Sequence, residues 1–418
     1  MRLLYSALFY VLLPAIIIRL WLRGRKAPNY RKRIKERFGF IQRRKGNRPC
    51  LWFHTVSVGE FIAARPLIHH YLEQGKYDVV VTTMTPTGSD RVTSTFADRV
   101  IHYYFPYDLT PFISRFLHRV RPDKYICMET ELWPNTIQCC FSRNIPVILA
   151  NGRLSEKSAA GYRKFAKLTR PMLAQISTAA IQNLADAERF IELGLNKTSA
   201  HITGSIKFDL DIENTTIQSA ETLKANINAV VEAPILIAAS THKGEDEIIL
   251  KAFSHLRQAA ENIRLIIVPR HPERFDTVTA LCESTGFSVA RRSQHKSENF
   301  DIMVGDTMGE LMLMLGAADY VFIGGSLVSN GGHNYIEPAA WSLPIISGPS
   351  TFNFLAIARE LQDASALTIV DNEHELAGVI QNYLANPELA KEHGQAGKRI
   401  ADNNRGALAR LITLINES

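Results

Sequence analysis

The sequence from 319 to 341 reads Asp319-Tyr-Val-Phe-Ile-Gly-Gly-Ser-Leu-Val-Ser-Asn-Gly-Gly-His-Asn-Tyr-Ile-Glu-Pro-Ala-Ala-Trp341. Its first five residues form a short apolar run, which is typical of a strand buried on both faces. Glu337 and Pro338 stand where the first turn of a helix is expected, so strand, glycine-rich loop and helix follow one another. This order predicts a wound α/β unit that binds ligands at the carboxyl ends of its parallel strands.

The chemistry of this loop indicates the kind of ligand. Glycines let the backbone approach a ligand closely, and the free N–H groups of a helix start favour a phosphate or a carboxylate. The Glu337 carboxylate would repel such an anion but suits a pair of sugar hydroxyls. The loop therefore predicts a site for a nucleotide-linked sugar, with the phosphate on the backbone and the ribose on Glu337. The alternative is an ordinary structural turn. The glycines concerned are Gly324, Gly325, Gly331 and Gly332.

Length and cysteine content limit the class of protein. A chain of 418 residues exceeds what one hydrophobic core usually organises, so two domains are expected. The five cysteines are odd in number and lack metal-ligand spacing, so the sequence predicts neither a disulfide framework nor a zinc site. A reducing compartment fits this pattern.

The N-terminus combines an apolar run with a basic cluster. Leu3 to Ile18 is almost uninterrupted, and thirteen Lys or Arg against one acid lie between Arg19 and Arg48. No small-residue cleavage site precedes the arginines, so we expect an uncleaved membrane anchor with the body on the cytoplasmic side. The basic cluster also suits anionic lipid. Nucleic-acid binding is disfavoured, because the cluster adjoins an apolar anchor and lacks interleaved aromatic residues. Pro14 and Arg19 leave open whether the anchor spans the membrane or lies at its interface.

The rest of the chain alternates strand and helix patterns in two series. We expect a membrane anchor and basic flank over 1–26, a first Rossmann-like domain over 27–209, a polar linker or surface helix between the domains over 210–232 and a second Rossmann-like domain over 233–418. Two doubly wound α/β domains with a nucleotide loop in the second describe, in outline, a GT-B glycosyltransferase.

Several predicted strand ends carry residues suited to chemistry. Glu60 follows a tight loop at a helix start, where a carboxylate can act on a substrate or simply interact with the helix dipole. Glu129 and Glu131 follow an apolar strand, and they suit either a sugar hydroxyl or ion pairs and caps. Arg270 lies between two prolines and suits a ligand phosphate or base, with a surface charge as the alternative. Asp306 to Glu310 is expected to start a helix, with Thr307 and Glu310 as a capping box. The backbone N–H groups of this helix start can also face a phosphate.

Six motifs in this order closely resemble those of the lipid A Kdo transferases, glycosyltransferase family 30, where Kdo is 3-deoxy-D-manno-oct-2-ulosonic acid. The motifs are Ser57-Val-Gly-Glu60, Met128-Glu-Thr-Glu-Leu-Trp-Pro-Asn135, Asn151-Gly-Arg-Leu154, Gly204-Ser-Ile-Lys207, Pro269-Arg-His-Pro272 and Gly324-Gly-Ser with the Gly-Gly-His-Asn and Glu337-Pro that follow. The resemblance runs from the anchor to the end of the second domain. It implies inverting, metal-independent transfer of Kdo from CMP-Kdo to the lipid A precursor lipid IVA, in lipopolysaccharide synthesis at the cytoplasmic face of a Gram-negative inner membrane.

The resemblance also assigns roles to residues. Glu60 is the implied general base. The implied CMP contacts are Pro269, Arg270, Met308, Gly309, Glu310, Asn334, Tyr335, Ile336 and Glu337. Further donor or acceptor contacts are expected at Ser57, Gly59, Glu129, Glu131, Arg153, Lys207, Gly325 and Ser326. No cofactor, no metal and no nucleic-acid partner is expected, and the oligomeric state is not predicted.

Two rival functions stay open at this point. One is a GT-B enzyme that uses another nucleotide sugar on a membrane lipid, and CMP but not UDP should protect the protein thermally if the Kdo assignment holds. The other is a non-catalytic binding protein of the membrane surface.

Overall fold

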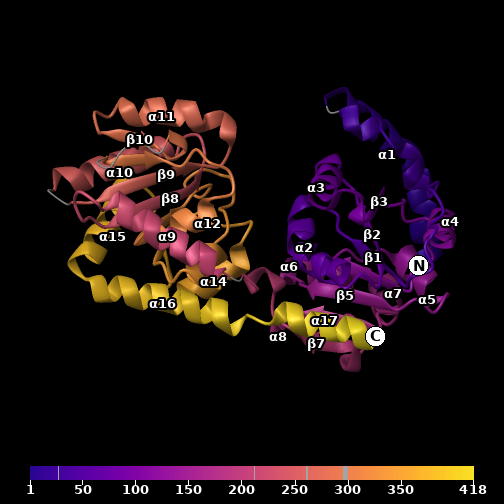
Figure 1. The fold of residues 1–418 in the computed structure, drawn as a ribbon. Helices are drawn as coiled ribbons and strands as arrows, with labels where there is room; N and C mark the ends of the chain where they lie inside the picture. The colour runs from indigo at the N-terminus through magenta and orange to yellow at the C-terminus, as the bar shows by residue number, and fades with distance from the viewer. Residues whose placement is uncertain (27, 211, 260–261, 295–299) are drawn as a thin grey trace. The chain divides into compact units, whose positions relative to one another are not determined.

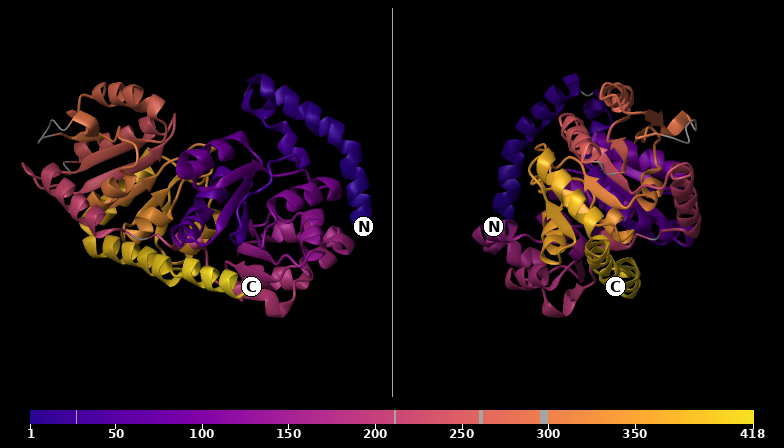
Figure 2. Two further views of the ribbon diagram at one scale, coloured as in Figure 1. Left: turned by 45° about the vertical axis from the view of Figure 1, so that its right-hand side comes forward. Right: turned by 90° about the vertical axis from the view of Figure 1, so that its left-hand side faces the viewer.

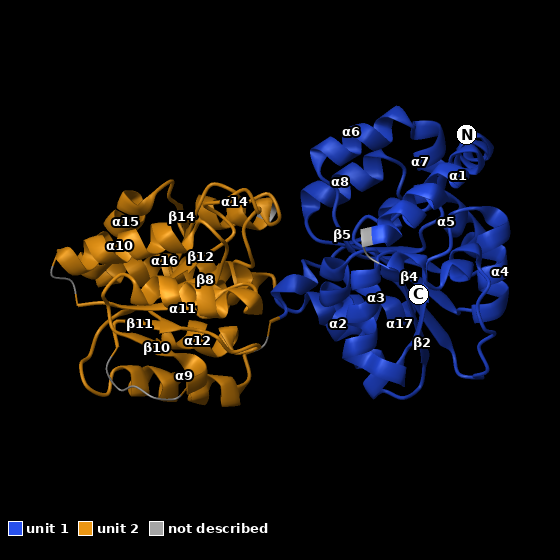
Figure 3. Ribbon diagram, turned by 90° about the horizontal axis from the view of Figure 1, so that it is seen from above, with its two compact units in different colours: residues 1–209, 405–418 blue, residues 210–404 orange. Residues whose placement is uncertain are grey.

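The computed structural model describes residues 1–26, 28–210, 212–259, 262–294 and 300–418. These residues form two compact units, each with its own sheet (Figure 3). Unit 1 comprises residues 1–209 and 405–418, and unit 2 comprises residues 210–404.

Within the described residues, unit 1 is built on a parallel seven-stranded sheet in the order β3-β2-β1-β4-β5-β6-β7 (Figure 1). Leu51 and Phe53 belong to one apolar cluster, whereas Trp52 belongs to another. Because successive side chains of a strand point to opposite faces, β1 is buried on both faces of the sheet. The strands are β1 (Cys50–His54), β2 (Asp78–Thr83), β3 (Ile101–Tyr104), β4 (Lys124–Met128), β5 (Val147–Gly152), β6 (Thr178–Ile181) and β7 (Ala200–Ile202).

The helices of unit 1 begin with α1, which is long and apolar enough over Arg2–Arg25 to cross a membrane. The α-helices are α1 (Arg2–Lys26), α2 (Val58–Glu73), α3 (Pro86–Phe96), α4 (Thr110–Val120), α5 (Pro134–Phe141), α6 (Glu156–Lys164), α7 (Ala166–Leu173), α8 (Leu184–Glu192) and α17 (Ala407–Glu417). Three short 3-10 helices matter below: η1 (Pro28–Arg31), η2 (Ile34–Phe38) and η5 (Ile206–Phe208).

Part of the basic cluster between Arg19 and Arg48 is built into unit 1. Arg37 is 3% exposed and donates from Nη2 to the Met84 carbonyl at 2.9 Å. Arg44 is paired with Asp78 at 2.5 Å and donates to the Val120 carbonyl at 2.8 Å. These arginines hold η2 and the segment after it against the sheet, so they are not free to bind lipid.

Unit 2 contains, within its described residues, a second parallel seven-stranded sheet in the order β10-β11-β9-β8-β12-β13-β14. The strands are β8 (Ile235–Thr241), β9 (Arg264–Pro269), β10 (Val289–Arg291), β11 (Ile302–Val304), β12 (Tyr320–Ile323), β13 (Ile345–Ser347) and β14 (Leu367–Ile369). The α-helices are α9 (Asn214–Ile227), α10 (Asp246–Gln258), α11 (Phe275–Glu283), α12 (Leu311–Ala317), α13 (Ile336–Ala340), α14 (Leu355–Asp363), α15 (Glu373–Ala385) and α16 (Pro387–Asn403).

The predicted domain limits need two corrections. Residues 210–232 contain a helix, α9, as one alternative held, but this helix belongs to unit 2, where it packs on α12 and buries Ala220, Leu223 and Ile227. The second domain does not extend to 418, because α17 returns to unit 1. Its Ala407, Leu411 and Ile415, spaced four residues apart, are at most 1% exposed and join the core cluster beside α2. Sequence order alone does not reveal that a terminal helix packs on the first domain.

In both sheets the strand order reverses once, between β1 and β4 in unit 1 and between β8 and β12 in unit 2. Ligands of wound α/β sheets bind outside the carboxyl ends of the strands at such a reversal. The loop before Glu60 and the loop that begins with Glu129 leave the reversal in unit 1, and the glycine-rich loop leaves the one in unit 2.

Candidate active site

Glu60 is held at the start of α2, directly after the central strand β1. Ser57 is the N-cap of the helix, and its hydroxyl donates to Glu60 Oε1 at 2.8 Å. The N–H of Val56 donates to Glu60 Oε2 at 2.7 Å. Burial raises the pKa of Glu60 in spite of these hydrogen bonds. A Cβ on the exposed Gly59 would meet only Ser57 Oγ within 4 Å, so the space beside Gly59 is open.

Glu129 forms ion pairs with two other predicted residues, Arg153 and Lys207, which come from different segments of the chain. The carboxylate is buried, and the backbone is in the left-handed region, with φ at 54°. Arg153 Nε lies 2.7 Å from Oε2, and Lys207 Nζ lies 2.8 Å from Oε1. Asn151 supports this arrangement, because its Oδ1 accepts from the Ile206 N–H at 3.2 Å. For Glu129 the ion-pair alternative is therefore what the structure shows.

Glu131 has no salt bridge within the described part of the chain. Burial, with the negative charges of Glu60 and Glu129, raises the pKa of Glu131 to about 7. The pKa of Glu131 lies near neutral pH partly because of the negative charge of Glu60. The ionisation of one of these two carboxyl groups therefore affects the ionisation of the other. Such perturbed groups gather at functional sites more often than elsewhere.

We expect Glu131→Gln to stabilise unit 1 at alkaline pH. A carboxyl group whose folded pKa is raised from 4.5 to about 7 binds its proton more tightly in the folded state. Its ionisation therefore lowers the free energy of unfolding as pH rises from about 4.5 to 7, by up to about 3 kcal/mol. Thermal unfolding at pH 4 and pH 8 measures this difference. The variant should melt higher than the parent at pH 8 and equally at pH 4, and an equal melting temperature at both pH values would contradict the assignment.

In unit 2 the glycine-rich loop differs from the prediction. The four glycine N–H groups already have protein partners: Gly324 donates to the Ala239 carbonyl, Gly325 to Glu245 Oε2, Gly331 to Ser350 Oγ and Gly332 to the Gly325 carbonyl. Glu245 is fully buried and also accepts from the N–H groups of His242, Ser326 and Leu327 at 2.9 Å each. The loop does bind an anion, but that anion is the protein's own carboxylate. These N–H groups are therefore not available to a donor phosphate.

The predicted helix start at Asp306 is also wrong. Helix α12 begins at Leu311, and Gly309 before it has φ at 86°, a conformation that interrupts a helix. The Thr307 hydroxyl donates to Glu310 Oε2 at 2.6 Å, and Arg292 Nε lies 3.1 Å from the same oxygen. Residues 306–310 therefore form a loop whose Met308 is 67% exposed.

Arg270 and Glu337 share one environment, as the sequence indicates. Burial raises the pKa of Glu337, against a hydrogen bond from Asn334 and the positive charge of Arg270. The Arg270 backbone donates to the Thr241 carbonyl at 3.0 Å, and its side chain is exposed. Arg274, four residues on, is structural: it is paired with the buried Asp246.

Three predicted contacts have side chains that point into the core. Tyr335 is fully buried and shares a 2.9 Å hydrogen bond with Ser347. Ile336 is 1% exposed. The buried Ser326 hydroxyl donates to the Ile323 carbonyl and accepts from the Gly348 N–H. The side chains of these residues are therefore not available to a ligand, and the Ser326 N–H is already bound to Glu245.

A histidine cluster at the same strand ends was not predicted. His242 Nε2 lies 2.8 Å from His333 Nε2, with the rings stacked at 5.0 Å, and the His271 ring lies 5.4 Å from His242. Burial, with the charges of His242, Arg270 and His271, lowers the pKa of His333 to about 4. A Cβ on Gly325 would lie 3.1 Å from the His333 ring, which explains one glycine of the loop. His271 belongs to the motif Pro269-Arg-His-Pro272, next to the predicted donor contact Arg270. This neighbourhood is the one signal in the sequence that could have indicated His271.

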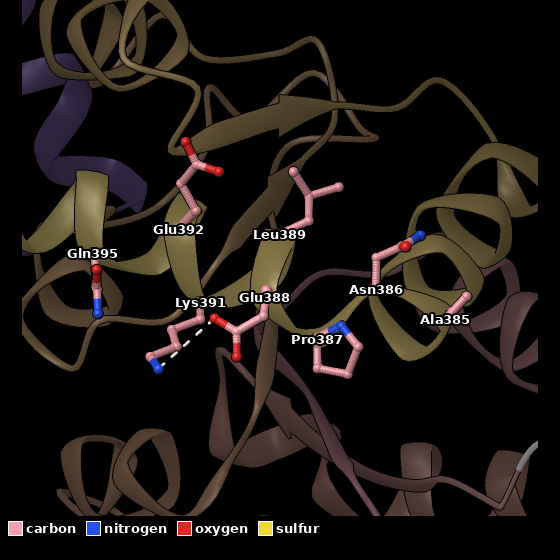
Figure 4. Close-up of a pocket in the computed structure, with 8 residues that line it drawn as sticks. All are labelled: Ala385, Asn386, Pro387, Glu388, Leu389, Lys391, Glu392 and Gln395. Carbon is pink, nitrogen blue, oxygen red and sulfur yellow. Dashed lines mark ion pairs between the residues drawn. The ribbon is translucent and has the colours of Figure 1, made fainter.

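A surface pocket of unit 2 lies away from these strand ends. It is lined by residues between Ala385 and Gln395 at the junction of α15 and α16 (Figure 4). Glu388 and Lys391 form an ion pair of 3.8 Å there. None of the predicted site residues lines it, so we do not assign it to the active site.

The two sheets define the class of the protein, which is the GT-B fold of glycosyltransferases. A glycosyltransferase from Rickettsia africae has this fold: it is 12% identical, matches with a TM-score of 0.56, and the match covers 89% of this chain and 99% of that one. The family model described as 3-deoxy-D-manno-octulosonic-acid transferase (kdotransferase) matches residues 32–210.

Two relatives extend the similarity to nearly the whole chain. A 3-deoxy-D-manno-octulosonic acid transferase of Haemophilus influenzae is 42% identical over 99% of this chain and 98% of that protein. A transferase of the same description from Bordetella pertussis is 31% identical over 99% of this chain and 98% of that protein. The chain therefore belongs to the family of 3-deoxy-D-manno-octulosonic acid transferases.

Proposed function

We propose that the protein transfers Kdo from CMP-Kdo to lipid IVA at the cytoplasmic face of the inner membrane. The observation that carries the proposal is Glu60, a carboxylate with a raised pKa, held at the strand reversal of unit 1 beside the open backbone of Gly59. A general base works best when its pKa lies near the working pH.

The transfer is a single displacement. An acceptor hydroxyl oxygen forms a bond to the anomeric carbon of Kdo, and its proton passes to Glu60. The bond from that carbon to the phosphate oxygen breaks, and CMP leaves with the electron pair. Attack opposite the leaving group inverts the anomeric centre.

The donor is assigned to unit 2. Arg270 is an exposed cation at the strand ends of unit 2, and its charge suits the departing phosphate. Glu337 and Asn334 suit the ribose hydroxyls, and the loop at Met308 to Glu310 suits the base. Because Glu245 occupies the loop N–H groups, we assign the phosphate to Arg270 and the neighbouring histidines rather than to the glycine backbone.

The test of the function is mass spectrometry of lipid IVA incubated with detergent-purified protein and freshly generated CMP-Kdo. EDTA is added once the donor has been made, because we also propose metal-independent transfer. A gain of one or more Kdo masses is expected. No gain, with CMP still bound, would point to another acceptor or to a binding protein.

We expect Arg270→Ala to weaken CMP binding without loosening the fold. Losing a charge-assisted hydrogen bond to phosphate should lower the affinity about 10- to 100-fold. The melting temperature without ligand should not change, because the Arg270 side chain is exposed. Calorimetric titration with CMP and thermal unfolding measure the two effects.

Arg274→Ala is the contrasting variant. It breaks a pair with the buried Asp246, so the melting temperature should fall even without ligand. An Arg270→Ala protein with unchanged CMP affinity would remove Arg270 from the donor site.

A further inference from the structure

The first turns of α1 are fastened to the body of unit 1. Ser6 Oγ and the Asn135 side chain exchange hydrogen bonds of 3.3 and 2.9 Å, and Arg2 donates to Asn135 Oδ1 at 3.5 Å. The Phe9 and Tyr107 rings lie 6.3 Å apart. Asn135 is fully buried at the start of α5, so these contacts are made with the interior of the unit.

The other end of α1 is fastened as well. Arg31 donates to the Trp21 carbonyl at 3.0 Å, and its guanidinium lies 4.3 Å from the Trp21 ring centroid. A Cβ on Gly24 would come within 2.4 Å of the Arg31 side chain, so the helix and η1 pack closely. Figures 1 and 2 show α1 at the edge of unit 1, and Figure 1 places the N-terminus beside α5.

The exposure of α1 follows one helical face. Partly or fully buried positions recur at residues 2, 5, 6, 9, 13, 16, 17, 20 and 24, the spacing of a single stripe. The opposite face is strongly exposed and apolar, with Leu3 at 81%, Val11 at 75% and Ile18 at 59%. Arg19, Arg23 and Arg25 are exposed toward the end of the helix.

These contacts do not fit a helix that crosses the bilayer. At 1.5 Å per residue, α1 is roughly 37 Å long, and the hydrocarbon core is about 30 Å thick. A spanning α1 would place Arg2 beyond that core and Ser6 at its far boundary, on the side away from the cytoplasmic body. Asn135 could not then reach them.

We propose that α1 lies in the plane of the cytoplasmic leaflet, with its exposed apolar face in the acyl region and its arginines on anionic headgroups. The inference rests on the proposed function, which places the protein at that membrane. The N-terminus then stays in the cytoplasm. Helix α5 starts three residues after Glu131, so α1 holds the loop of Glu129 and Glu131 at the surface where a lipid acceptor lies.

The first test locates the N-terminus in the cell. A short N-terminal tag with one cysteine is labelled with a membrane-impermeant maleimide in spheroplasts, before and after permeabilisation. The native cysteines are buried, so their background is low. We expect labelling in intact spheroplasts to be at least about 10-fold lower than after permeabilisation, as for a cytoplasmic site. A Ser418→Cys variant provides the cytoplasmic control.

Strong labelling in intact spheroplasts would overturn the proposal, and so would recovery of the protein in the soluble fraction. Transfer activity is measured on the same preparations. A protected tag with no Kdo transfer would reject the proposed function and leave the helix placement standing.

The second test locks the helix in place. In membranes, Phe9→Cys with Tyr107→Cys should form a disulfide that shifts gel mobility on mild oxidation. Leu8→Cys with Tyr107→Cys is the matched control, because Leu8 lies on the exposed face at 56% and should not crosslink. Equal crosslinking of the two cysteine pairs would contradict a docked α1. Failure of both pairs to crosslink would also contradict it, provided that the introduced cysteines react with a thiol reagent.

Discussion

Glu60→Gln should lower the turnover of Kdo transfer by about 10²- to 10⁴-fold, the range typical of a lost general base, and leave CMP affinity unchanged. Glutamine keeps an oxygen that can accept from Val56 or Ser57, so the start of α2 should persist. It has no basic site for the acceptor proton at neutral pH. Steady-state kinetics and CMP titration measure the two effects.

The pH profile of the parent enzyme tests the same assignment. The base works only when it is ionised, and burial raises the pKa of Glu60. Turnover should therefore fall as the pH drops, and it should begin to fall at a higher pH than expected for a glutamate with an ordinary pKa.

Glu73→Gln is the matched control for Glu60→Gln, because it is an exposed change in the last turn of α2. It should keep full activity. Substantial activity in Glu60→Gln, or loss of CMP binding with activity, would exclude the role of base.

Glu245→Gln should destabilise unit 2 and abolish donor binding. The carboxylate accepts from four backbone N–H groups with no exposure to water. In glutamine an NH2 group replaces one carboxylate oxygen, so about two of the four backbone N–H groups lose their acceptor. Each buried N–H without a partner costs about 1–3 kcal/mol of stability. For a unit of this size, the melting temperature should drop by roughly 5–15 °C. The loop that carries Asn334 and Glu337 would lose its support, so CMP should no longer raise the melting temperature.

Glu247→Gln is the control for this substitution, because Glu247 lies in the first turn of α10, two residues after Glu245, but is exposed. It should melt within about 1 °C of the parent, as surface changes usually do. If Glu245→Gln melts normally and still binds CMP, Glu245 does not hold the loop.

The wound α/β architecture was predictable because its signals are local. Strands buried on both faces leave continuous apolar runs, such as Cys50 to Phe53, and caps such as Ser57 stand directly before their helices. A helix near Glu60 was predicted for the same reason, although it begins at Val58, two residues before the predicted start. The prediction at Asp306 failed because one residue, Gly309, takes a left-handed conformation that the capping pattern did not reveal.

Contacts between distant residues were not predictable in the same way. Glu245 binds Gly325 from 80 positions away, and nothing near either residue indicates the other. The family motifs indicated Glu129, Arg153 and Lys207 as donor or acceptor contacts, but they did not show that these residues pair with one another. The cluster of His242, His271 and His333 depends on three loops that meet only after the sheet has formed.

The return of α17 to unit 1 sets an order on folding during synthesis. Unit 2 is continuous in sequence, so its residues 210–404 are all available before the last fourteen leave the ribosome. Unit 1 emerges first but finishes last, because its core by α2 stays uncovered until Leu411 and Ile415 arrive. Each of these side chains adds about 1.5–3 kcal/mol when buried. A premature stop near the end of the gene would therefore damage the domain that was translated first.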